Sequence, residues 1–255
     1  MSISLEIKSS INNYTLKSVD NSLDQINKEL NNNAFFIIDK NIYDLYFKKG
    51  EAFDESTNNF FVIESCEQNK SIDQCSTIIK KLVEKKVRRS SHLVAIGGGV
   101  IQDITAFTAS IYLRGIPWIF FPTTLLAQAD SCIGGKTSIN LGDTKNIVGG
   151  FYPPEKIYLD FKFLDTLSNE DIRSGIGEIL HFYFYSNSKF IDLMMGEYDS
   201  LVKTPQKLIN YIVESLLIKK SVIENDEFDQ GERNKFNYGH TFGHAIETAT
   251  NYKIK

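Results

Sequence analysis

The sequence predicts an α/β protein in which a parallel-sheet domain at residues 1–160 precedes a mostly α-helical domain at residues 161–255. Two patterns predict this class. Short apolar runs alternate with segments of helical spacing up to about residue 160, as in a parallel sheet with helical crossovers. Beyond that point the spacing is helical, interrupted by a charged segment at 224–233. A functional site is expected where two such domains meet.

The expected elements follow from these patterns in order. Ser4–Ile7 alternates between polar and apolar residues, which favours an edge strand. Apolar residues recur at helical spacing over 71–87, beginning with Ile72, Cys75 and Ile78, so a helix is expected there. Further strands are expected at 34–38, 60–63, 93–96, 117–121 and 157–159, and further helices at 169–187, 205–223 and 238–250.

Composition excludes several classes of function. The 255 residues are 42% hydrophobic and 24% charged, which is typical of a globular protein. A formal net charge of -4 leaves no general basic surface for nucleic acid. Three cysteines without a C-x-x-C pattern suit a reducing compartment. The sequence has neither a leader pattern nor an apolar stretch of about eighteen residues, so a cytoplasmic protein without membrane contact is expected.

A glycine turn is the first candidate for a binding function. Gly97, Gly98 and Gly99 follow the expected strand at 93–96 and open into a helical segment. Glycines let a pyrophosphate approach the backbone, and a helix N-terminus favours negative charge. The spacing differs from G-x-G-x-x-G. The turn therefore predicts a phosphate or dinucleotide cradle, with a tight structural turn as the alternative.

A histidine pair is the second candidate. His240 and His244 are two of the four histidines and lie four residues apart, so in a helix both rings project from one face. Gly239 and Gly243 remove side-chain bulk beside them. Imidazole binds zinc-like ions and titrates near neutral pH, so the pair suits a metal, a phosphate or both, with a purely structural face as the alternative.

An ordered series of short blocks connects these features. The blocks combine glycines with threonine, lysine and acidic residues, and include Pro122-Thr123-Thr124, Gly134-Gly135-Lys136, Lys145-Asn146, Gly177-Glu178 and Gly231-Glu232-Arg233. From about residue 35 onward, the chain resembles the 3-dehydroquinate synthases of the sugar-phosphate cyclase family. The resemblance implies an enzyme, a phosphorus–oxygen lyase that cyclises a heptulosonate phosphate and eliminates phosphate. It also implies catalytic NAD, a Zn2+ or Co2+ ion and a homodimer.

The resemblance assigns metal and substrate residues. Glu178 and His240 match two of the family's three metal ligands. The third is a histidine in a segment that normally follows the position where this chain stops, so either the C-terminal part is truncated or the metal site is incomplete. Arg114 matches a residue that enters the neighbouring subunit's site. The candidates for a substrate with a carboxylate and a phosphate are polar or cationic residues: Asp130, Lys136, Lys145, Asn146, Lys219, Arg233, Asn237 and His244.

The same resemblance assigns the NAD-binding residues. The candidates in two early segments that contact the adenosine half are Asp39, Glu67 and Lys70. The candidates that match the pyrophosphate and nicotinamide contacts are Gly98, Gly99, Asp103, Thr123 and Thr124. The candidates in a further NAD-contacting segment are Phe163, Thr166 and Leu167.

One departure from the family pattern bears on the substrate. His181 stands where the family usually has a lysine that approaches the substrate, three residues after Glu178. The change replaces a permanent cation by a shorter imidazole. It favours the nearest alternative, a cyclase acting on another sugar phosphate. The other two alternatives are an NAD-dependent polyol or alcohol dehydrogenase of the same architecture and a non-catalytic homologue that lacks the complete metal site.

Overall fold

The computed structural model describes residues 3–48, 53, 59–142, 144–238, 242–243, 246 and 249–250. The chain divides into two compact units. Met1–Thr123 and Gly134–Phe161 form the first unit, whereas Thr124–Ile133 and Lys162–Lys255 form the second. The backbone therefore leaves the first unit after Thr123 and returns to it ten residues later. The domain ranges 1–160 and 161–255 remain predictions.

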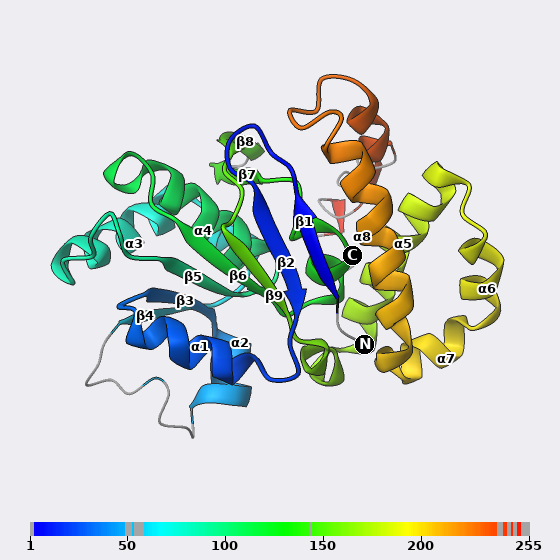
Figure 1. The fold of residues 1–255 in the computed structure, drawn as a ribbon, viewed down its shortest axis with the longest axis horizontal. Helices are drawn as coiled ribbons and strands as arrows, with labels where there is room; N and C mark the ends of the chain where they lie inside the picture. The colour runs from blue at the N-terminus through cyan, green and yellow to red at the C-terminus, as the bar shows by residue number, and fades with distance from the viewer. Residues whose placement is uncertain are drawn as a thin grey trace. The chain divides into compact units, whose positions relative to one another are not determined.

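A mostly parallel sheet forms the centre of the first unit (Figure 1). Within the described residues it has seven strands, in the order β1-β2-β9-β6-β5-β3-β4. Neighbouring strands pair in parallel, except for β1 and β2, which are antiparallel. The α/β class with an N-terminal parallel sheet is thus confirmed. The strands are β1 (Ser4–Ile7), β2 (Tyr14–Ser18), β3 (Phe35–Asp39), β4 (Phe60–Ile63), β5 (Leu93–Gly97), β6 (Trp118–Pro122) and β9 (Lys156–Leu159).

The inner strands are buried along their whole length. Every residue of β3, β5 and β6 is buried, which is typical of parallel strands covered on both faces. The covering helices are α1 (Ser22–Asn31), the short α2 (Lys40–Ile42), α3 (Ile72–Glu84) and α4 (Gly99–Ile111). In the view of Figure 1, α3 and α4 lie above these strands and α1 lies below them. Because β3, β4, β5 and β6 run in parallel, their carboxyl ends share one edge of the sheet.

Most strands and helices expected from apolar spacing are present, with ends that differ from the expected ones by at most four residues. The helix expected at 71–87 is α3, which begins after Ser71 because the Ser71 hydroxyl accepts a hydrogen bond from the Gln74 N–H at 3.2 Å. Its last turn ends before Lys86, whose φ is 55°. The expected strands at 93–96 and 117–121 correspond to β5 and β6.

Several elements of the first unit were not predicted. The polar N-terminal region contains β2 and α1, whose buried apolar residues are few: Tyr14, Leu16 and Ile26. The hairpin of β7 (Lys136–Leu141) and β8 (Thr144–Phe151) was also missed. No residue of β8 is buried, so its sequence lacks the apolar alternation by which strands are recognised.

The second unit is helical in its described part. α5 (Asn169–Ser186) and α8 (Ile209–Ile223) pack against each other and match the expected helices at 169–187 and 205–223. The Tyr183 hydroxyl of α5 donates to the Tyr211 carbonyl of α8 at 2.9 Å. Two short helices, α6 (Phe190–Gly196) and α7 (Tyr198–Lys203), were not expected. The helix expected at 238–250 lies largely outside the described residues.

The π-helical turn η4 (Ala127–Ser131) joins this helical core from far along the chain. It contacts both α5 and α8, and the Ser215 hydroxyl donates to the Ala129 carbonyl at 3.0 Å. A Cβ added to Gly175 would lie 2.4 Å from Leu125, so glycine at this position allows α5 to approach closely.

None of the described helices combines the length and apolar character needed to cross a membrane.

Candidate functional site

The glycine turn lies at the carboxyl edge of the sheet, where parallel strands bind ligands in many α/β proteins. Gly97 ends β5, and the Gly98 carbonyl accepts the first helical hydrogen bond of α4, from Gln102 N at 3.0 Å. No side chain in the described part of the chain caps the N-terminus of α4. A Cβ added to Gly99 would meet no atom within 4 Å, so the space over this helix start is open. An anion can therefore approach the first N–H groups of α4.

Two other NAD candidates also lie at strand ends on this edge. Thr123 follows β6, is buried, and donates its N–H to the Gly97 carbonyl at 3.0 Å. Asp39 ends β3, and its Oδ1 accepts from Asn41 N at 2.7 Å and Ile42 N at 3.4 Å, which caps α2. Burial raises the pKa of Asp39, and these hydrogen bonds partly oppose that shift.

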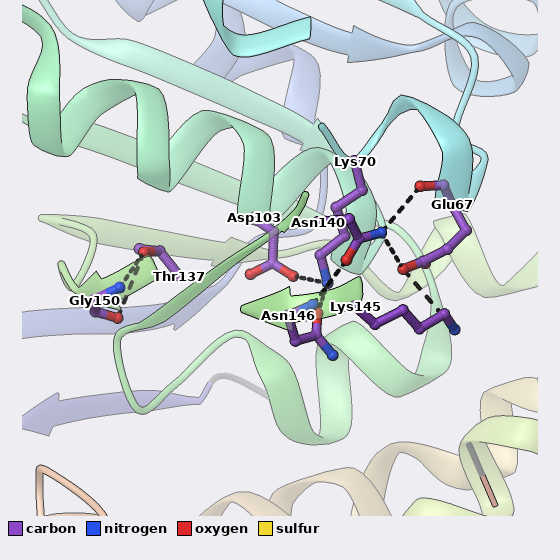
Figure 2. A network of polar contacts seen from close by, with 8 residues as sticks. All are labelled: Glu67, Lys70, Asp103, Thr137, Asn140, Lys145, Asn146 and Gly150. Carbon is purple, nitrogen blue, oxygen red and sulfur yellow. Dashed lines mark hydrogen bonds and ion pairs between the residues drawn. The ribbon is translucent and has the colours of Figure 1, made fainter. Parts of the chain in front are cut away.

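A buried lysine organises the polar cluster in the same unit (Figure 2). The Lys70 Nζ lies 2.6 Å from Asp103 Oδ2 and donates to Asn146 Oδ1 at 2.8 Å. Burial raises the pKa of Asp103 from an ordinary value of 3.8 to about 6, although the positive charge of Lys70 opposes the rise. The removal of water thus outweighs the ion pair at this carboxylate.

Lys145 and Glu67 form the outer part of the cluster. The Lys145 Nζ lies 3.9 Å from Glu67 Oε1, a long ion pair between half-buried side chains that contributes little stability. Lys136 is exposed at the start of β7. The structure therefore brings together candidates predicted separately: Glu67, Lys70 and Asp103 for NAD with Lys145 and Asn146 for the substrate.

Asn140, which connects these groups, was not predicted. Its Nδ2 donates to Glu67 Oε1 at 2.8 Å, and its Oδ1 accepts from Asn146 N at 2.9 Å. It follows Ile139 in a strand without a clear alternating pattern, 73 residues from Glu67. The only sequence signal for Asn140 is its position shortly before the Lys145-Asn146 block. Its burial could not be inferred from the sequence, because the hairpin itself was not predicted.

The second unit holds its own buried charge pair. The Lys219 Nζ of α8 donates to Asp130 Oδ1 at 2.6 Å and to the Asp130 carbonyl at 2.8 Å. Lys219 is 6% exposed, so its ammonium group is held in one orientation by η4. Burial raises the pKa of the neighbouring Cys132 thiol to about 12, which makes this cysteine an unreactive packing residue. The two predicted substrate residues Asp130 and Lys219 are thus brought together.

Glu178 and His181 lie one turn apart on α5, with 3.7 Å between Glu178 Oε1 and His181 Nδ1. His181 also lines a hollow of about 730 Å3, together with Asn237 and the rings of Phe184, Tyr185, Tyr238 and Phe242. The predicted residues His240 and His244 lie outside the described part of the chain. Among the described residues, no group of three His, Cys, Asp or Glu side chains is arranged to hold a metal.

Arg233, Asn237 and Arg114 are placed by local structure. Arg233 is buried in the 3-10 turn η7 (Glu232–Asn237), where its guanidinium group donates to the Glu227 carbonyl. The exposed Asn237 donates to Asp229 Oδ2 at 3.3 Å. Arg114 is exposed in the 3-10 turn η3 (Tyr112–Arg114) with φ at 67°.

The remaining NAD candidates make short-range contacts. The Thr124 hydroxyl oxygen accepts from Ala127 N at 3.2 Å and so begins the turn that leads to η4. Phe163 is buried in the 3-10 turn η5 (Phe161–Thr166), and the Thr166 hydroxyl donates to its carbonyl at 3.3 Å. The Leu167 N–H donates to the Leu164 carbonyl at 3.3 Å.

Comparison with known proteins gives a consistent family. Models of the N-terminal and C-terminal parts of 3-dehydroquinate synthase match residues 60–174 and 175–255. The 3-dehydroquinate synthase of Dictyoglomus turgidum is 45% identical over 196 residues, which cover 76% of this chain and 55% of that protein. The chain therefore spans little more than half the length of this curated relative.

Two solved structures share the fold across almost the whole chain. One is 2-epi-5-epi-valiolone synthase from Streptomyces hygroscopicus subsp. jinggangensis with NAD+ and Zn2+ bound, at 25% identity and a TM-score of 0.82, covering 99% of this chain and 72% of that one. The other is 2-deoxy-scyllo-inosose synthase complexed with carbaglucose-6-phosphate, NAD+ and Co2+. It is 24% identical with a TM-score of 0.84, and the match covers 99% of this chain and 71% of that one.

Proposed function

Because the chain belongs to the 3-dehydroquinate synthase family, we propose that it is part of an enzyme that cyclises a heptulosonate phosphate and eliminates phosphate. The proposal includes catalytic NAD and a divalent metal, as named for the valiolone synthase that shares its fold. The cluster around Lys70 carries the proposal, because it joins candidate NAD residues and candidate substrate residues within one hydrogen-bonded group.

The glycine turn fits the pyrophosphate of NAD. Gly99 leaves open space above the N-terminus of α4, and the uncapped N–H groups of that helix favour an anion. We assign the adenosine half to the side of Asp39, Glu67 and Lys70. When bound, NAD supplies the hydride acceptor and donor that this class of cyclisation needs.

The chain's own residues orient the substrate and stabilise negative charge. Lys219 has three N–H donors, and Asp130 takes two of them, so we propose that the third points to a substrate oxygen. Lys145 and Asn146 bind the substrate beside the NAD residues. Arg233 has the planar donor geometry that suits a carboxylate. Cations held rigidly in this way favour a transition state in which negative charge develops on oxygen.

The metal part of the proposal rests on Glu178 and His240. A carboxylate and an imidazole are ligand types of catalytic zinc, which when bound polarises a substrate oxygen. The described residues contain no complete ligand group for a metal.

A cyclase acting on a different sugar phosphate is the second candidate. His181, in the wall of the hollow beside Asn237, favours it because a lysine is usual at the matched position. Product analysis separates the two: dehydroquinate supports the first proposal, and another cyclic product supports the second. Net accumulation of NADH instead of either would indicate a dehydrogenase.

NAD binding is tested by calorimetry with wild type and Gly99→Val. A Cβ at this position meets no protein atom within 4 Å, so the valine side chain would project into the open space over α4, and we expect at least a tenfold rise in the Kd for NAD in a folded protein. Gly196→Val is the control, because a Cβ at this helical glycine of the second unit also meets no atom within 4 Å. Undetectable binding to folded wild type at millimolar NAD would refute the cofactor assignment.

A further inference from the structure

Asn140 contacts both sides of the Lys70 cluster through donors and acceptors of its backbone and side chain (Figure 2). Its side-chain Nδ2 donates to Glu67 Oε1 at 2.8 Å and to the Glu67 carbonyl at 3.3 Å. Its Oδ1 accepts from Asn146 N at 2.9 Å, and its own N–H donates to the Lys70 carbonyl at 2.9 Å. Three of these hydrogen bonds connect the hairpin β7–β8 to the 3-10 turn η2 (Glu67–Asn69) and to Lys70, which follows it, and the fourth lies within the hairpin.

The residue that Asn140 holds on the hairpin side has an uncommon backbone conformation. Asn146 has a φ of 54°, in the left-handed region, where surrounding contacts must compensate for a less favourable backbone. In this conformation its side chain accepts from Lys70 Nζ and its N–H points to Asn140. Asn146 is therefore held at two points, by Asn140 at its backbone N–H and by Lys70 at its side chain.

An amide is the side chain that meets both requirements. The Asn146 N–H needs an acceptor, whereas the Glu67 carbonyl and carboxylate need a donor. Aspartate supplies the acceptor but places a second carboxylate against Glu67. Leucine has a similar shape but leaves buried polar groups on both sides without partners, which is costly.

We propose that Asn140 is a positioning residue that fixes Glu67 and Asn146 relative to each other and thereby sets the NAD-binding affinity of the cluster. The proposal extends the proposed function, and the identification of the ligand as NAD rests on that function. Asn140 itself acts through Glu67, Asn146 and Lys70.

The first experiment needs no ligand. Amide hydrogen exchange is measured residue by residue by NMR in wild type, Asn140→Ala and Asn140→Asp. We expect Asn140→Ala to speed exchange at Asn146 at least tenfold and Asn140→Asp to retain most of the protection, since aspartate keeps the acceptor. Thr137→Val is the matched control, because the Thr137 hydroxyl oxygen accepts from Gly150 N at 3.0 Å at another point of the same hairpin.

The second experiment measures the Kd for NAD in a double-mutant cycle. Asn140→Asp should raise the Kd about tenfold, which corresponds to about 1.4 kcal/mol. Combining it with Glu67→Gln restores a donor–acceptor pair with reversed polarity and leaves the net charge as in wild type. We expect the double variant to bind NAD more tightly than Asn140→Asp alone, and at least fivefold more tightly than the product of the single effects. Thr137→Val should change the Kd less than twofold.

The outcomes separate the two proposals. If folded wild type does not bind NAD, the proposed cofactor role fails, and with it the assigned effect of Asn140 on NAD. If wild type binds NAD but Asn140→Asp binds equally well, or the single effects multiply without coupling, the positioning role of Asn140 is refuted while the cofactor role stands. Unchanged exchange at Asn146 in Asn140→Ala would also refute the positioning role.

Discussion

Replacing Asp103 by asparagine should remove a pH dependence of stability from the first unit. Burial raises the pKa of Asp103 from 3.8 to about 6 in the folded protein, so this carboxyl binds its proton more tightly when folded. Its contribution to stability is therefore complete below pH 3.8 and is lost as the pH rises through about 6. For these two pKa values, linkage gives a gain of about 1.4 kcal/mol at pH 5.0 relative to pH 7.5.

The assay is urea unfolding followed by tryptophan fluorescence. Trp118, the single tryptophan, is buried in β6 and reports on the unit that contains Asp103. The free energy of unfolding of wild type minus that of Asp103→Asn should increase by about 1.4 kcal/mol from pH 7.5 to pH 5.0. Taking the difference cancels the titration of all other groups that both proteins share. Asp20→Asn removes an exposed acid of the same unit and should retain the wild-type dependence.

A difference between wild type and Asp103→Asn that stays constant with pH would refute this reasoning. A change of the opposite sign would mean that Lys70 lowers the pKa of Asp103 more than burial raises it.

Three further results are expected. Lys70→Met leaves Asp103 buried without its cation, so unfolding at pH 7.5 should show a loss of roughly 3–5 kcal/mol, and a loss below about 1 kcal/mol would contradict the pairing. Gly175→Ala places a Cβ 2.4 Å from Leu125 and should destabilise the second unit by about 1–3 kcal/mol in thermal unfolding. Gly177→Ala is the control and should not destabilise it, because a Cβ at Gly177 meets no atom within 4 Å. Iodoacetamide at pH 8 should modify Cys66 in the native protein and spare the buried Cys75 and Cys132. Burial raises the thiol pKa of Cys75 to about 11 and that of Cys132 to about 12. Mass spectrometry of the labelled peptides measures the modification at each cysteine.

Strong apolar spacing made much of the fold predictable. The inner strands β3, β5 and β6 are uninterrupted apolar runs, and α3 and α5 show regular helical spacing between capping residues, so local sequence was sufficient. No residue of β8 is buried, and α1 has one buried apolar residue, Ile26. Their sequences alone carry too weak a pattern to predict them.

Most residues of the candidate site could be predicted from the sequence, but the hydrogen bonds and ion pairs that join them could not. The family resemblance selected Lys70, Asp103 and Asn146 individually, and the structure adds that they share hydrogen bonds. The pairing of Asp130 with Lys219 spans 89 residues, so no local pattern reveals it. Asn140 was not predicted because three of its four hydrogen bonds reach Glu67 and Lys70, about 70 residues away, whereas its residue type is common at strand ends and turns.

The excursion of Thr124–Ile133 into the second unit has a consequence for synthesis on the ribosome. The helices that receive this segment are made much later: Lys219 follows Asp130 by 89 residues, or roughly 4–18 s at about 5–20 residues per second. During that interval Leu125, Ala127 and Ala129 have been made, but the α8 surface that covers η4 does not yet exist. A nascent chain paused between the two units therefore exposes an apolar segment that a chaperone can bind. For the same reason, a fragment starting at residue 162 would lack the segment on which Ser215 and Lys219 close their hydrogen bonds.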